Sequence, residues 1–209
     1  MPIFTSKMQT SFNYILLPPK TIKDGETYPL IVCLHGAGER GTDTELLYVH
    51  GIPKYVRQGL DIPAFVLAPQ CPSGFCWNSF PIQVKELIDK IVAENPIDPD
   101  RITATGLSMG GFGSWDLAVT YPDFFAAIAP ICGGGLSWRC SALKNMSIWA
   151  FHGDSDTVVP PKNSIEMVDA VKAAGGNPKL TIFHNVGHGS WEPAYEDTNL
   201  INWLLAQKR

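Results

Sequence analysis

Short runs of apolar residues alternate along this chain with longer stretches whose apolar residues recur at helical spacing. Residues 30–34 (Leu-Ile-Val-Cys-Leu) form a continuous apolar run, which is typical of a strand buried on both faces of a sheet. Residues 82–93 instead place their apolar side chains along one side of a helix, which Asn95 and Pro96 then end. Strands that alternate with helices need crossover connections, so the pattern predicts an α/β fold with a mainly parallel central sheet flanked by helices.

The same pattern assigns most of the chain to such elements. We expect strands at residues 12–17, 30–34, 64–68, 101–105, 126–131, 148–151 and 180–183. We expect helices at residues 82–93, 114–120, 165–174 and 199–206. Because no repeat or linker-like stretch divides the sequence, we expect residues 1–209 to form a single domain.

Composition excludes several classes of protein. The formal net charge is −4, so no basic field exists to attract nucleic acid or anionic lipid. The apolar runs are too short to cross a bilayer, so we expect neither a nucleic-acid nor a membrane partner. Residues 1–7 do not resemble a signal peptide, which favours the cytoplasm and leaves secretion open if a leader has been removed. The oligomeric state is not indicated.

The cysteines are Cys33, Cys71, Cys76, Cys132 and Cys140. None forms a C-x-x-C pair, and no histidine stands at zinc-ligand spacing from them, so we expect no metal and no other cofactor. The pairs 71/76 and 132/140 could each close a loop. The odd count and the missing export signal favour reduced thiols, while the disulfide alternative remains open.

Polar, glycine-rich segments directly follow several of the expected strands. In parallel sheets the functional residues collect at the carboxyl ends of the strands, so these segments should meet along one edge. They lie at residues 35–38, 69–70, 106–110, 152–156 and 185–189.

The segment at residues 106–110 (Gly-Leu-Ser-Met-Gly) has the pattern G-x-S-x-G. It lies between an expected strand and an expected helix, which is the setting of a nucleophile elbow. A sharp turn would expose the serine hydroxyl, and side chains at 106 or 110 would collide with the neighbouring strand and helix. The following helix would direct free N–H groups at the reaction centre. We therefore predict Ser108 as a nucleophile. The alternative is an incidental serine in a glycine-rich turn.

A serine hydroxyl needs an adjacent base, and histidine is the usual choice. His188 lies in a flexible loop beyond the last strand, so we favour it over His184, which directly follows that strand. His35 and His152 each end a strand beside a glycine, so we expect them to stabilise loops. His50 lies upstream of Ser108 in an undistinguished segment.

The base needs an acid to fix its tautomer. Asp154 and Asp156 both follow the strand at residues 148–151. Asp156 precedes a turn into the next element, and the chain order Ser108, Asp156, His188 is the order that α/β-hydrolases use. We therefore favour Asp156, and we expect Asp154 to shape the loop through nearby backbone N–H groups.

The chain resembles the dienelactone-hydrolase-like and carboxylesterase branch of the α/β-hydrolases. It is similar to bacterial esterases related to polyhydroxybutyrate depolymerases and feruloyl or acetyl-xylan esterases. The resemblance rests on residues 34–41, 68–70, 106–111, 152–160 and 186–189. It supports Asp156 and His188, and it implies that the backbone N–H groups of Ala37 and Met109 bind the oxyanion. Dienelactone hydrolases proper use a cysteine nucleophile, so Ser108 argues against that activity.

We therefore expect a serine carboxylic-ester hydrolase that forms an acyl-enzyme from small to medium acyl esters, with feruloyl and acetylated-carbohydrate esters as candidates. Residues 133–146 are too short for a lid domain, so the cleft should be open. Gln70, Trp77 and Trp191 are candidate substrate contacts, and Trp138, in the connection at residues 133–146, could also line the cleft. The alternatives are a prolyl-oligopeptidase-like peptidase, a thioesterase or a non-catalytic binding module.

Overall fold

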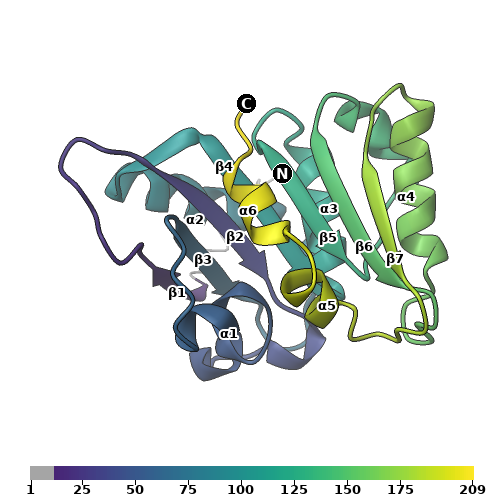
Figure 1. Cartoon of the computed structure of the whole chain (residues 1–209), viewed down its shortest axis with the longest axis horizontal. Coiled ribbons are helices and arrows are strands. Elements are labelled where there is room, and N and C mark those ends of the chain that lie inside the picture. Colours follow the sequence, from purple (N-terminus) through teal and green to yellow (C-terminus); the bar gives the residue numbers. More distant parts are fainter. Residues whose placement is uncertain (1–11) are drawn as a thin grey trace, which may run out of the picture.

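A seven-stranded sheet runs through the centre of the molecule (Figure 1). The computed structural model describes residues 12–209. The sheet order is β1-β3-β2-β4-β5-β6-β7, and every pairing is parallel except that of β1 with β3. The strands are β1 (Asn13–Leu17), β2 (Tyr28–Leu34), β3 (Phe65–Gln70), β4 (Ile97–Leu107), β5 (Ala127–Ile131), β6 (Ser147–Gly153) and β7 (Lys179–Phe183). The predicted α/β class and its mainly parallel sheet are confirmed.

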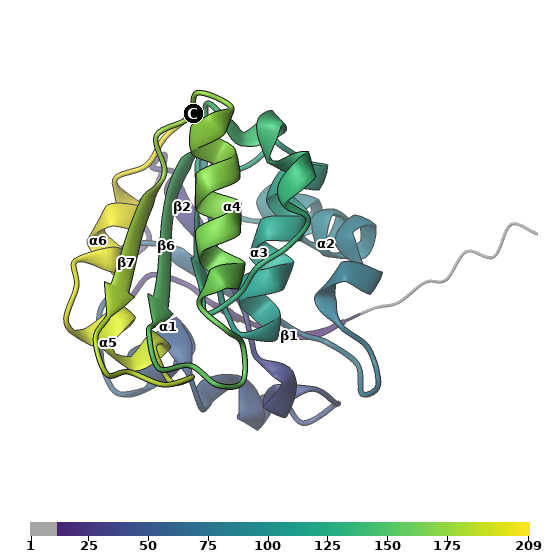
Figure 2. The same cartoon turned by 90° about the vertical axis from the view of Figure 1, so that its right-hand side faces the viewer.

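Helices cover both faces of this sheet (Figures 1 and 2). One face carries α2 (Pro81–Glu94), α3 (Met109–Thr120) and α4 (Lys162–Ala173). The other carries α1 (Gly51–Arg57), α5 (Trp191–Glu196) and α6 (Leu200–Leu205). A separate hydrophobic cluster fills the space on each side, so the sheet is buried on both faces.

Strand β2 shows why its sequence is apolar without interruption. Leu30 and Val32 pack into the cluster beneath α2 and α3, while Ile31 and Cys33 pack into the cluster beneath α1 and α6. Successive side chains of a strand point to opposite faces. A strand with a core on each side therefore needs apolar residues at every position.

Helix α3 begins at Met109, five residues earlier than the expected start at residue 114. Its first turns contain Gly110, Gly111 and Gly113, and glycine is unfavourable within helices. Packing explains the exception, because a Cβ atom at Gly113 would lie 2.6 Å from the Cβ of Trp77. The short helices α1 and α5 were not expected either.

The connection from β5 to β6 holds the short 3-10 helix η4 (Ser137–Leu143) and no separate lid. All five cysteines are free thiols, so neither candidate disulfide is present. None of the helices in the described residues is both long and apolar enough to span a bilayer. The segment on which the signal-peptide expectation rests, residues 1–7, lies outside the described residues.

Candidate active site

Ser108 occupies a sharp turn between β4 and α3. Its backbone has φ 52° and ψ −116°, a region that residues with a side chain rarely adopt. The turn is tight enough that a Cβ atom at Gly106 would collide with the carbonyl of Gly110, and one at Gly110 would collide with the carbonyl of Leu34 on β2. Both glycines of the motif are therefore sterically required, as the sequence predicts.

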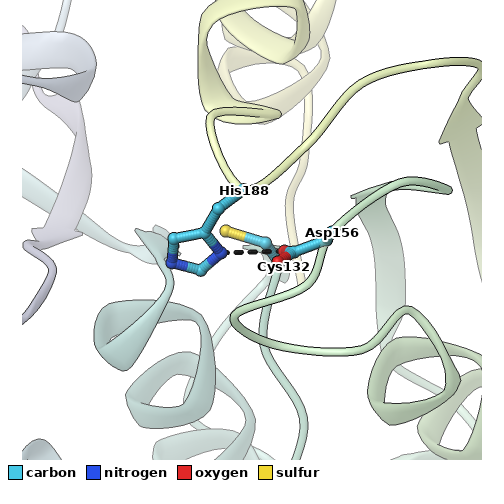
Figure 3. A group of neighbouring side chains, drawn as sticks. All are labelled: Cys132, Asp156 and His188. Carbon is cyan, nitrogen blue, oxygen red and sulfur yellow. Dashed lines mark hydrogen bonds and ion pairs between the residues drawn. The ribbon is translucent and has the colours of Figure 1, made fainter.

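Ser108, His188 and Asp156 form an unbroken chain of hydrogen bonds. The distance from Ser108 Oγ to His188 Nε2 is 2.9 Å, and the distance from His188 Nδ1 to Asp156 Oδ2 is 2.8 Å. The three side chains come from loops that follow β4, β7 and β6 at one edge of the sheet, and Figure 3 shows His188 directed at Asp156. Residues that lie up to 80 positions apart in the sequence thus meet at one point.

The Asp156 side chain is fully buried and accepts several hydrogen bonds. Its Oδ1 accepts from the backbone N–H groups of Val158 and Val159, both at 2.9 Å. Burial by itself would raise the pKa of this carboxyl. The hydrogen bonds from His188, Val159 and Val158 outweigh burial and hold the pKa below its usual value, so Asp156 is ionised at neutral pH.

The two competing candidates, Asp154 and His184, bond to each other on the surface. His184 Nδ1 lies 2.6 Å from Asp154 Oδ2, and Asp154 Oδ1 accepts the N–H of Asn185 at 2.8 Å. The side chain of His184 is 85% exposed. Asp154 thus shapes the loop after β7 through a backbone N–H, as the sequence predicts.

His152 is a second, fully buried histidine behind Asp156, and sequence reasoning missed this contact. Its Nε2 lies 2.8 Å from the carbonyl of Val159 and 3.3 Å from Asp156 Oδ2. Because both of these atoms are acceptors, Nε2 carries the proton. Nδ1 faces the hydroxyl of Ser164 at 2.7 Å. Burial lowers the pKa of His152, against the raising influence of Val159 and Asp156, so the ring is neutral. The sequence carries no evident signal for this contact, because it depends on how the turn after β6 folds.

The loop that follows β2 lies beside Ser108 and leads into the 3-10 helix η1 (Ala37–Glu39). Ala37 is the first residue of η1 and Met109 is the first residue of α3, so neither N–H has an acceptor within its own helix. Both residues border the same pocket as Ser108. Two backbone N–H groups of residues that line this pocket therefore have no acceptor within their own helices.

His35 fixes the start of this loop. Its Nδ1 lies 2.6 Å from the carbonyl of Gly36, and its Nε2 accepts the N–H of Cys71 at 2.9 Å. An N–H facing Nε2 requires the neutral ring with its proton on Nδ1. Burial lowers the pKa of His35 to about 4, with the Gly36 carbonyl opposing that shift. His35 thus stabilises a loop, as expected.

Three further side chains hold the same loop. Gln70 is buried, and its Nε2 donates to the carbonyls of Glu39 and Asp43 at 2.9 and 2.8 Å. Trp77 Nε1 donates to the carbonyl of His35 at 3.0 Å, and Arg40 Nε donates to that of Ala37 at 2.9 Å. Gln70 therefore supports the loop from behind and does not border the pocket, in contrast to the contact expected from the sequence.

A pocket of about 640 Å³ opens beside Ser108 and follows α3. Its lining residues are Ala37, Arg40, Cys76, Trp77, Asn78, Ser108, Met109, Phe112, Gly113, Trp115, Asp116, Val119, Gly134, Gly135, Leu136 and Met167. Trp77 is thus a wall residue. Trp191 is not among the lining residues, and it packs edge-on against His188 with ring centroids 5.5 Å apart. Trp138 is 77% exposed and also lies outside the lining.

Cys132 lies next to the acid–base pair, as Figure 3 shows. Ligand atoms of Cys132, Asp156 and His188 all lie within 4.8 Å of one another, a spacing that could suit a metal ion. However, a hydrogen bond already joins His188 to Asp156, and burial raises the pKa of the Cys132 thiol to about 12, which disfavours a thiolate ligand. The Sγ of Cys132 instead accepts the Ser108 N–H at 3.3 Å.

The parallel sheet, the helices on both faces and the serine turn between β4 and α3 define an α/β-hydrolase fold. A solved structure of a thermostable esterase is similar over 94% of this chain and 59% of that chain, with a TM-score of 0.83 and 38% identity. A family model described as "Putative esterase" matches residues 77–209. The chain belongs to this esterase family.

Two curated proteins illustrate the range of its relatives. Poly(3-hydroxyalkanoate) depolymerase C of Paucimonas lemoignei is 27% identical over 81% of this chain and 42% of its own length. Feruloyl esterase B of Piromyces equi is 32% identical over 51% of this chain and 22% of its own length. The chain thus spans less than half the length of either relative.

Proposed function

We propose that this chain hydrolyses carboxylic esters, with Ser108 as nucleophile, His188 as general base and Asp156 as the acid that orients the histidine. The observation that carries the proposal is the continuous hydrogen-bond chain from Ser108 Oγ through both nitrogens of His188 to Asp156 Oδ2. This series of hydrogen bonds joins a nucleophile, a base and an orienting acid in the arrangement that acyl transfer requires. Membership of the esterase family supports the same reaction.

The proposed reaction has two steps. Ser108 Oγ attacks the ester carbonyl while His188 Nε2 takes the hydroxyl proton. The N–H groups of Ala37 and Met109 stabilise the resulting oxyanion, and each such donor typically contributes ~10²–10³ in rate. His188 then returns the proton to the departing alcohol, which leaves Ser108 acylated. Water, activated by His188, attacks the acyl group and releases the acid.

The pocket supports an acyl group of small to medium size. Its volume of about 640 Å³ is ordinary for a small-molecule site. Trp77, Phe112, Trp115 and Met167 give it mostly apolar walls. An acetyl group would fill little of this space, whereas a feruloyl group or a short hydroxyalkanoyl unit would use more of it. Esters related to those named for the two curated relatives are therefore the first candidates, with acetylated carbohydrates as the smaller alternative.

The direct test is hydrolysis of p-nitrophenyl butyrate by the wild-type chain and by Ser108→Ala. We expect the variant to lose essentially all activity while it keeps its thermal midpoint. Full activity in Ser108→Ala would overturn the proposal. A panel of oxygen esters, thioesters and peptides then separates ester hydrolysis from the thioesterase and peptidase alternatives.

A further inference from the structure

The pocket extends well beyond the serine. It follows α3 from Ser108 to Asp116 and Val119. Helices rise 1.5 Å per residue, so the Cα of Asp116 lies about 12 Å along the helix from that of Ser108. Helical side chains lean toward the N-terminus, which brings the Asp116 carboxylate somewhat closer to Ser108. The middle of the pocket is apolar, with Phe112 and Met167 among its walls.

Asp116 is a carboxylate with unused acceptor capacity in this wall. Its side chain is 23% exposed, and its Oδ1 lies 3.5 Å from Nη1 of Arg139, which is long for a hydrogen bond. The Nη2 atom of Arg139 faces the carbonyl of Val119 and the hydroxyl of Thr120, each at 3.4 Å. Burial raises the pKa of Asp116, and Arg139 only partly opposes that shift. A hydrogen-bond donor on a ligand would stabilise the carboxylate.

The end of the pocket remote from Ser108 thus combines apolar walls with one acceptor, the Asp116 carboxylate.

We propose that this end of the pocket binds a hydroxyl group carried by the acyl part of the ester. The hydroxyl donates to the Asp116 carboxylate. The inference rests on the proposed function, because the ester carbonyl at Ser108 fixes one end of the acyl group. A phenolic acyl group and an aliphatic hydroxyacyl chain share this chemistry.

Two pairs of esters test the proposal and distinguish these sources. Methyl p-coumarate and methyl cinnamate differ only in the phenolic hydroxyl, and the p-nitrophenyl esters of ω-hydroxyoctanoate and octanoate differ only in an aliphatic one. One hydrogen bond to a charged group should favour the hydroxylated ester by about 10- to 100-fold in kcat/KM. We expect this preference in the phenolic pair, because Phe112 offers an exposed aromatic ring in the pocket wall. A preference only in the aliphatic pair would support the site and identify a hydroxyalkanoyl ligand.

Variants at Asp116 separate this site from general pocket effects. Asp116→Leu removes the acceptor and keeps the number and branching of side-chain heavy atoms, so the ratio of the two kcat/KM values should fall close to one. Asp116→Asn keeps one acceptor oxygen without the charge, so the ratio should be intermediate. Asp169→Asn is the matched control, because Asp169 is exposed on α4 and does not border the pocket. Its ratio should match that of the wild type.

The outcomes are distinct. A wild-type ratio close to one in both pairs, or a preference that survives in Asp116→Leu, would overturn the hydroxyl site while leaving ester hydrolysis intact. If the wild-type chain hydrolyses neither these esters nor p-nitrophenyl butyrate, the proposed function itself is wrong. Thermal midpoints of all variants check that each one is folded.

Discussion

At the scale of single residues, the Asp156 carboxylate is the most heavily bonded group of the site. It faces the N–H groups of Val158 and Val159 on one oxygen, and the rings of His188 and His152 on the other. An ionised buried carboxylate needs such donors, because burial alone would favour the neutral acid. His152 is therefore expected to position Asp156 for its bond with His188.

Replacing His152 tests that role. His152→Phe removes a donor to Asp156 and leaves the Val159 carbonyl unpaired, so we expect kcat/KM to fall by about tenfold or more and stability to fall by roughly 1–3 kcal/mol. With one donor fewer, the Asp156 carboxylate is held less firmly against His188, so the fall should appear in kcat, with the KM for p-nitrophenyl butyrate little changed. His152→Gln retains an amide donor and should recover part of both effects. An unchanged kcat in His152→Phe would contradict the positioning role.

At the scale of elements, the turn from β4 into α3 depends on close approach of backbones. Gly110 lies against the carbonyl of Leu34 on β2, which leaves no room for a Cβ atom. The strain at Ser108 is held by this packing and by the bond from its N–H to the carbonyl of Ile131 at 2.9 Å. The turn and the strands on both sides of it therefore form one rigid unit.

Gly110→Ala should destabilise the protein strongly, since backbone would have to move. We expect a loss near the upper end of overpacking effects, about 3 kcal/mol, in the free energy of unfolding measured with denaturant. Gly38→Ala is the matched control, because a Cβ atom there has no neighbour within 4 Å. Equal stability losses in the two variants would show that close packing is not what requires glycine at residue 110.

The same elements show what the sequence could and could not predict. The strands were predictable because a sheet with a core on both faces demands continuous apolar runs, as in β2. The first half of α3 was not predictable, because Gly110, Gly111 and Gly113 lower helix propensity. Only tertiary packing explains why glycine stands at these positions of a helix. Gln70 is the last residue of β3, two residues beyond the predicted end of that strand, and position alone does not say that its side chain turns inward to hold a loop.

At the scale of the whole molecule, the sheet topology assembles the site. The chain leaves β2 toward β3 on one side and returns to β4 on the other, so the loops after β2 and β4 diverge at a topological switch point. The loop that begins at His35 and the turn at Ser108 lie at that point. Loss of order in the first loop should therefore affect both stability and activity.

His35 makes global stability depend on pH. In the unfolded chain a histidine takes up a proton below about pH 6.5, whereas buried His35 stays neutral down to about pH 4. The unfolded state binds more protons in that window, so stability is complete above pH 6.5 and falls as the pH drops toward 4. The expected loss from this residue is roughly 3 kcal/mol.

Denaturant unfolding at several pH values between 4 and 7 measures this dependence. His35→Gln should flatten it. An unchanged slope in His35→Gln would mean that other groups cause the acid sensitivity.

The central claim is that Ser108 is an activated nucleophile. Intact-mass analysis of the chain after exposure to a fluorophosphonate, followed by peptide mapping, tests it most directly. The account predicts a single covalent adduct on Ser108 in the wild-type chain, and a much slower reaction in His188→Gln because the base is missing. No adduct, or an adduct on another residue, would contradict the account.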